Sequence, residues 1–260
     1  MISPDSRREP IFNVPAVISA LLGIMVAIHV ARQFLSEAND DWLVLALAFV
    51  PDRYLGHASH WPGGVISAWT SPVTHMFVHG DWTHLLLNGA SLLAFGGIVA
   101  RRLSTVRLLL FVLFAGLAGA ATFFALNRSV DAPMIGASGA ISGLMAATLR
   151  LMFCAIDQAP PGSAGELIRR RPDRIALTGL RSAFADPRLR SATALWLVLN
   201  VLATYGLGTP GASGPIAWEA HIGGFVAGLL GYGWFDTVNP PKPPVTAGKN
   251  SPADQLFTSN

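Results

Sequence analysis

The chain has 260 residues, of which 52% are hydrophobic and only 13% are charged. An ordinary soluble domain has about 25% charged residues, so the composition excludes a soluble globular protein and predicts an all-α membrane protein. The formal net charge of +3 does not indicate a nucleic-acid partner, because the basic residues are concentrated at the ends of apolar segments.

Six apolar segments are predicted to be transmembrane helices. They cover residues 14–35, 80–100, 106–126, 133–156, 192–207 and 216–235. The first is expected to be a retained helix, because a secretory signal peptide has a shorter apolar region and a small-residue cleavage site. The fifth is short, and we expect it to be tilted little or thinly anchored.

Polar stretches divide the rest of the chain. Residues 1–13 form a predicted N-terminal arm, residues 14–238 the membrane domain and residues 239–260 a flexible tail, while residues 157–191 form a polar connection within the membrane domain. The apolar run 42–51 has only ten residues, too few to span roughly 30 Å of hydrocarbon as a helix. We expect it to lie half-immersed in the loop after the first helix.

The Lys and Arg residues predict the orientation of the chain. Fifteen of the 18 lie in the N-terminal arm, the second and fourth connections and the tail, whereas Arg32, Arg53 and Arg128 lie on the opposite side. The side with the excess is cytoplasmic by the positive-inside bias, so both termini are expected there. Because no organelle-targeting segment is apparent, the expected location is a bacterial plasma (inner) membrane.

A few polar residues interrupt the apolar segments. Ser138 lies in the fourth and His221 in the sixth, while His84 and Asn88 lie four residues apart in the second and so share a helix face. Counted from the predicted outer ends, Ser138 and His221 lie roughly 9 Å deep and His84 roughly 6 Å deep, at 1.5 Å per residue. Three independently bounded helices therefore bring polar groups to similar depths, which a random scatter would not do.

Small residues flank this polar group. Gly139 and Gly143 form a small-xxx-small pair in the fourth segment, and Gly224 and Gly228 form another in the sixth. Such pairs let two helix backbones approach closely. If the two faces meet, Ser138 and His221 come within hydrogen-bond reach.

These residue types are the ones that a serine hydrolase needs. A serine hydroxyl becomes a nucleophile when a base accepts its proton, and a neutral imidazole such as that of His221 is the usual base. The backbone N–H of Ser138 and the side chains of His84 and Asn88 are candidate donors to an oxyanion. Because hydrolysis needs water, the site is predicted to line a cavity that opens to the outer side.

Other interpretations remain for single residues. Ser138 taken alone is more often a packing serine. His84 and Asn88 can also be interpreted simply as residues that form hydrogen bonds between helices. A metal site at His75, His79 and His84 is disfavoured, because no H-E-x-x-H motif occurs in the sequence. The single cysteine, Cys154, excludes a disulfide framework. A transporter would show repeated halves, and none is evident.

The sequence resembles the rhomboid intramembrane serine proteases. Three motifs carry the resemblance, and it extends over residues 14–235: His79-x4-His84-x3-Asn88, Gly136-x-Ser138-Gly139, and Ala220-His221-x2-Gly224-x3-Gly228. It implies a six-helix fold, a Ser138–His221 dyad, an oxyanion site using His84 and Asn88, and supporting roles for the remaining motif residues. It also implies transmembrane protein substrates, membrane lipids as partners, and no cofactor. The alternative is a non-proteolytic rhomboid-like protein that escorts client helices.

The chain departs from the rhomboid pattern in three places. Its first loop lacks the Trp-Arg pair of some bacterial members, and Ser142 stands where some have a tyrosine that packs on the catalytic imidazole. What orients His221 is therefore open. The connection 157–191 is longer than expected for a compact member, and is interpreted as either regulatory or disordered.

Overall fold

The computed structural model describes residues 14–128, 132–204 and 217–237. These residues are helical apart from loops and one isolated β-bridge, so the prediction of an all-helical chain is confirmed. Within them, three helical stretches are long and apolar enough to cross a membrane: Trp82–Ala100, Thr105–Leu126 and Ser138–Gln158. Such helices indicate an integral membrane protein.

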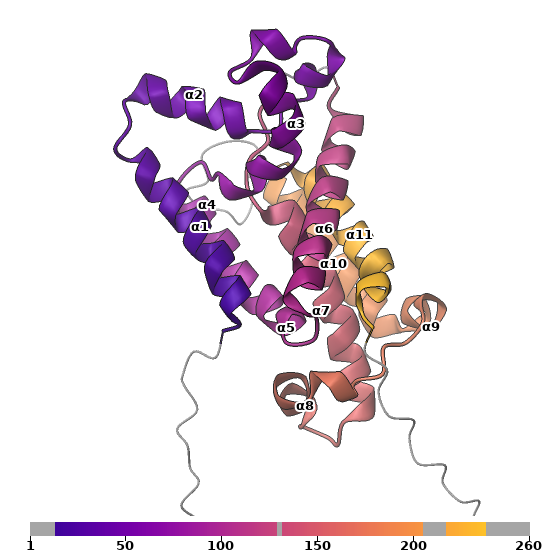
Figure 1. Ribbon diagram of the computed structural model, residues 1–260. Helices are drawn as coiled ribbons and strands as arrows, with labels where there is room; N and C mark the ends of the chain where they lie inside the picture. The colour runs from indigo at the N-terminus through magenta and orange to yellow at the C-terminus, as the bar shows by residue number, and fades with distance from the viewer. Residues whose placement is uncertain (1–13, 129–131, 205–216, 238–260) are drawn as a thin grey trace, which may run out of the picture.

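Figure 1 shows the α-helices in their order along the chain. They are α1 (Ala16–Arg32), α2 (Glu37–Leu47), α3 (Gly64–Thr74), α4 (Trp82–Ser91), α5 (Gly97–Ala100), α6 (Thr105–Leu126), α7 (Ser138–Gln158), α8 (Ala164–Arg170), α9 (Leu180–Ala185), α10 (Pro187–Thr204) and α11 (Trp218–Phe235). A π-helical turn at Leu92–Gly96 joins α4 to α5. Figure 1 shows α2 and α3 at one end of the bundle and α8 and α9 at the other.

The centre of the bundle is formed by α6, α7 and α11, which pack against one another. Glycines permit the close approach of α7 and α11. A Cβ atom at Gly224 would overlap the carbonyl oxygen of Gly139, and one at Gly228 would overlap that of Gly143. The two predicted small-residue faces therefore meet, with backbone against backbone.

Three helices begin later than the sequence predicts. The fourth was expected from residue 133, but α7 begins at Ser138, because Gly136 has φ +106° and Met134 pairs with Phe49 in the β-bridge. Similarly, α4 begins at Trp82 rather than 80 and α11 at Trp218 rather than 216. A helical rise counted from residues 80, 132 and 215 therefore does not apply to the first residues of these segments. Instead, His84, Ser138 and His221 each lie in the first turn of their helices.

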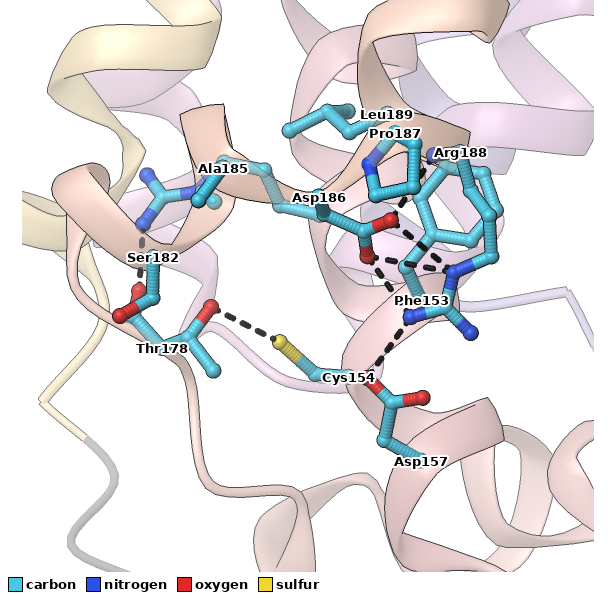
Figure 2. Close-up of a pocket in the computed structure, with 12 residues that line it drawn as sticks. Phe153, Cys154, Asp157, Thr178, Ser182, Ala185, Asp186, Pro187, Arg188 and Leu189 are labelled. Carbon is cyan, nitrogen blue, oxygen red and sulfur yellow. Dashed lines mark hydrogen bonds and ion pairs between the residues drawn. The ribbon is translucent and has the colours of Figure 1, made fainter.

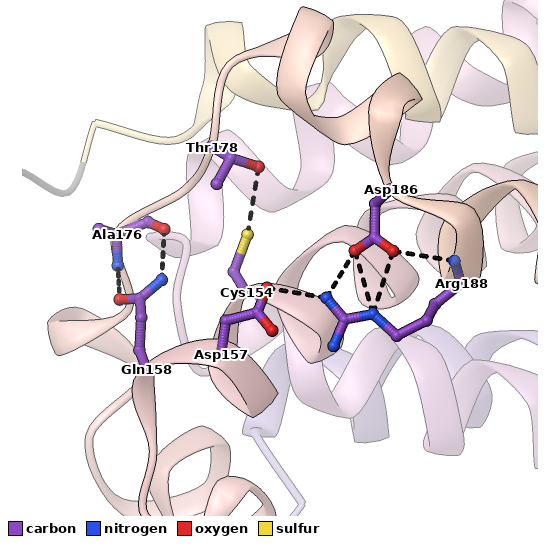
Figure 3. Close-up of polar contacts among 7 residues, drawn as sticks. All are labelled: Cys154, Asp157, Gln158, Ala176, Thr178, Asp186 and Arg188. Atoms are coloured by element: carbon purple, nitrogen blue, oxygen red, sulfur yellow. Dashed lines mark hydrogen bonds and ion pairs between the residues drawn. The ribbon is translucent and has the colours of Figure 1, made fainter.

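The polar connection 157–191 is folded, so the interpretation of it as disordered is wrong. It contains α8, α9 and the start of α10, which begins at Pro187 rather than at residue 192. Long-range pairs hold it against α7 (Figure 3). The Gln158 side chain bonds both backbone groups of Ala176, at 2.8 and 2.7 Å, and Arg188 bonds Asp157 at 2.8 Å. Polar side chains of this stretch thus form hydrogen bonds within the protein.

The predicted half-immersed run 42–51 is split between two conformations. Its first part belongs to α2, and after Leu47 the chain becomes extended and forms the β-bridge from Phe49 to Met134. Arg53 lies buried below this turn and donates to the carbonyl oxygens of Leu45 and Pro62. The predicted arm 1–13 and the predicted tail 239–260 both fall in the part of the chain that the structure does not describe.

Candidate active site

Ser138 and His221 are in hydrogen-bond contact. The Oγ atom of Ser138, the first residue of α7, lies 2.7 Å from Nε2 of His221, in the first turn of α11. The close packing of these helices explains the contact. A Cβ atom at Gly139 would lie 3.3 Å from the carbonyl oxygen of Ala220, the residue before His221. Ser138 and His221 thus each follow or precede a residue at which the two backbones are in close contact.

A cavity of about 560 Å³ adjoins this pair. Ser138, His221, His84 and Asn88 all line it, together with apolar side chains from α4, α7 and α10. The structure therefore brings together the four residues that the sequence singles out for chemistry. A cavity with a few converging polar groups in an apolar wall is typical of a substrate site.

The start of α7 offers donors to a developing oxyanion. The first N–H groups of a helix, here those of Ser138 and Gly139, have no intrahelical acceptor and lie at the positive end of the helix dipole. His84 lies beside Gly136, two residues before Ser138, since a Cβ atom at Gly136 would be 2.6 Å from His84 Nε2. Asn88 donates one N–H to the His84 carbonyl oxygen at 3.0 Å, which leaves the other N–H of its amide for the cavity.

His79 lies behind His84 rather than among the residues that line the cavity. It is fully buried, and its ring packs edge-on against His84 with centroids 5.0 Å apart. Burial, with repulsion from His84, lowers the pKa of His79 to about 3, so its ring is neutral at pH 7. Its carbonyl oxygen accepts a hydrogen bond from Arg32, which is paired with Asp40. Its position is that of a packing partner of His84.

Asn200 of α10 is a site residue that the sequence analysis missed. Its Oδ1 atom lies 2.7 Å from Nδ1 of His221, and its Nδ2 donates to the carbonyl oxygen of Trp218 at 3.3 Å. Its side chain is 7% exposed. Asn200 is the one amide in the apolar segment 192–207, and this was the signal available in the sequence.

Residues 66–161 match the family model of the rhomboid domain. The chain contains a rhomboid domain. The match includes His79, His84, Asn88 and Ser138 and ends before α10 and α11. A search of the curated proteins gives no match for the chain.

Hydrogen bonds from other residues support the loop that precedes Ser138. The backbone N–H of Gly136 donates to the carbonyl oxygen of His75 at 2.9 Å, and the buried His75 ring is bonded to Ser71 through Nδ1 at 2.9 Å. Across the described ranges, no three His, Cys, Asp or Glu side chains gather as metal ligands. Glu219, two residues before His221, accepts a hydrogen bond from the Asn127 side chain at 3.1 Å.

A second cavity, of about 510 Å³, lies beside the C-terminal part of α7 (Figure 2). Cys154 on its wall follows Ser138 by 16 residues, roughly 24 Å along a helix. Arg188 bonds both Asp157 and Asp186, and its hydrogen bonds hold the pKa of Asp186 below its usual range. Thr178 Oγ1 lies 3.5 Å from Cys154 Sγ. Since Arg188 and the two carboxylates pair with one another, these contacts attach α10 to α7.

Proposed function

We propose that the chain is an intramembrane serine endopeptidase, which hydrolyses peptide bonds in or near the transmembrane segments of membrane proteins. The observation that carries the proposal is the 2.7 Å contact between Ser138 Oγ and His221 Nε2 beside a cavity. A nucleophile and a base from different helices, held at this distance, are the minimum for acyl transfer. The rhomboid domain supports the choice of a membrane-embedded substrate.

The reaction follows from the positions of these groups. His221 Nε2 accepts the proton of Ser138 as its oxygen attacks the carbonyl carbon of the substrate. The N–H groups at the start of α7, with His84 and Asn88, stabilise the oxyanion that forms. His221 then protonates the leaving amine, and a water molecule in the cavity hydrolyses the acyl-enzyme by the same steps in reverse order. No cofactor takes part in this scheme.

The proposal includes an arrangement in the membrane. Six helices span a bacterial plasma membrane, both termini are cytoplasmic, and the half-immersed first loop and the active site lie at the outer side. The basic residues of α8, of the stretch around α9 and of the start of α10 support this orientation, because they gather at the end of α7 opposite Ser138. Transmembrane proteins are the proposed substrates, and lipids the surroundings.

The rival function is that of a rhomboid-like protein that binds client helices without cutting them. Such a protein has no chemical need for a base beside Ser138. The retention of His221 at 2.7 Å therefore favours the enzyme. Covalent labelling of Ser138 by a serine-directed fluorophosphonate separates the two functions without a known substrate, because only an activated hydroxyl reacts.

The decisive experiment is cleavage of a reporter transmembrane substrate by the purified, reconstituted protein. We expect Ser138→Ala and His221→Ala each to lower kcat/KM at least about a thousandfold, and the double variant to be little worse, because the two residues act as a unit. The matched control is Ser182→Ala, an exposed serine on α9, which should cleave like wild type. Normal cleavage by Ser138→Ala would refute the mechanism.

A further inference from the structure

We propose that Asn200 is the positioning residue for His221, holding the imidazole in the tautomer and orientation in which Nε2 faces Ser138. This inference rests on the proposed function, since it assigns a role within the same reaction. Asn200 then takes the orienting role that Ser142 does not fill. The Ser142 hydroxyl donates to the Ser138 carbonyl oxygen at 2.8 Å. Ser142 thus directs its hydroxyl to its own helix, and the imidazole takes its support from α10.

The hydrogen bonds of the Asn200 amide define which tautomer it selects. Its Nδ2 donates to the Trp218 carbonyl oxygen, and a carbonyl oxygen can only accept. The amide oxygen is therefore the atom that faces His221, and it too can only accept. Nδ1 of His221 must then carry the proton, at 2.7 Å from that oxygen. In a neutral imidazole this leaves the lone pair on Nε2, at 2.7 Å from Ser138 Oγ.

An amide suits this position better than a carboxylate. Asn200 is buried on a helix that the proposal places in the membrane, where an ionised side chain is costly. The amide supplies the same acceptor without a charge. It cannot neutralise the imidazolium that forms during the reaction, so its contribution is orientation more than charge stabilisation. We therefore expect a smaller effect than loss of the dyad itself.

The position of Asn200 depends on how α10 docks. Leu189, Trp196 and Asn200 recur at intervals of seven and four residues, so they share one face of α10. Trp196 stacks on Phe225 of α11 with centroids 4.2 Å apart, and Leu189 is buried. Neighbouring side chains on the other faces, such as Leu199, are exposed. The orienting amide thus lies on the face by which α10 attaches to α11.

The kinetic test compares Asn200→Ala, Asn200→Asp and the exposed control Asn39→Ala. Asn200→Ala should lower kcat about tenfold to a hundredfold with little change in KM, because a hydrogen bond that orients the base is lost. Asn200→Asp should restore much of kcat and move the acidic limb of the pH–rate profile to higher pH, since a carboxylate stabilises the imidazolium. Asn39→Ala should match wild type in both.

A spectroscopic test works without turnover. The ¹⁵N shifts of the His221 ring in wild-type protein should report a proton on Nδ1 near neutral pH, and Asn200→Ala should shift the population towards the other tautomer. If wild-type His221 carries its proton on Nε2, or if Asn200→Ala keeps the wild-type kcat and pH profile, the inference is wrong. If Ser138→Ala cleaves, the proposed function fails instead, while the ring shifts still decide the tautomer.

Discussion

Gly136 shows how one residue combines a backbone requirement with a contact in the site. Its φ of +106° lies in a region that a side chain disfavours, and this turn ends the extended segment before α7. A Cβ atom here would also lie 2.6 Å from His84 Nε2. The backbone N–H of the same residue is bonded to His75. Gly136 therefore positions both Ser138 and the His84 side of the proposed oxyanion site.

Replacing Gly136 by alanine should damage activity more than stability. We expect Gly136→Ala to destabilise the fold by about 1–2 kcal/mol through its φ angle, and to lower kcat at least about tenfold, because the new methyl group displaces His84. The matched control is Gly56→Ala, where φ is +100° but nothing lies within 4 Å of the new Cβ. Thermal unfolding and reporter cleavage of both variants measure the two effects. Equal loss of kcat in both would show that the His84 contact is irrelevant.

At the scale of helices, the α7–α11 interface determines the distance between Ser138 and His221, the proposed nucleophile and base. Gly139 and Gly143 lie against Gly224 and Gly228, with carbonyl oxygens where side chains would otherwise be. Such packing excludes even one methyl group, because the obstructing atoms belong to rigid backbone rather than to movable side chains. Ser138 and His221 sit at one end of this interface. A change in this interface, away from the cavity, can therefore alter the contact between Ser138 and His221.

Gly228→Ala tests this transmission, since Gly228 lies two helical turns beyond His221. The added methyl group would overlap the backbone of Gly143, so α11 must move away from α7. We expect a loss of about 1–3 kcal/mol from overpacking and a fall in kcat of about tenfold or more, because near-attack geometry is sensitive to shifts of about 1 Å. Gly233→Ala on the same helix has free space around the new Cβ and should behave like wild type. Wild-type kcat in Gly228→Ala, measured on folded protein, would contradict the coupling.

For the whole molecule, hydropathy and motif spacing in the sequence predict the apolar segments and the main candidate site residues. They predict little of the helix boundaries and side-chain pairings that depend on tertiary contacts. The apolar segments and the residues Ser138, His221, His84 and Asn88 follow from pattern. The start of α7 does not, because residues 133–137 are apolar yet lie outside the helix, where Met134 pairs in the β-bridge and Gly136 has a positive φ. Arg188 pairs with Asp157, which lies 31 residues earlier in the chain, and composition does not reveal this pairing. Asn200 gains its meaning only through the docking of α10 on α11.

The orientation of the whole chain is testable by cysteine labelling, because Cys154 is its single cysteine. In a Cys154→Ser background, Ser59→Cys and Ser182→Cys place one thiol at an exposed position near each end of the bundle. If the basic end is cytoplasmic, as the positive-inside bias predicts, a membrane-impermeant maleimide should label intact cells at position 59 but not at 182. Permeabilised cells should be labelled at both. The opposite labelling pattern in intact cells would show that the topology is inverted and that the Ser138 cavity lies at the cytoplasmic face. The peptide bonds within reach of Ser138 would then be those near the cytoplasmic ends of substrate transmembrane helices.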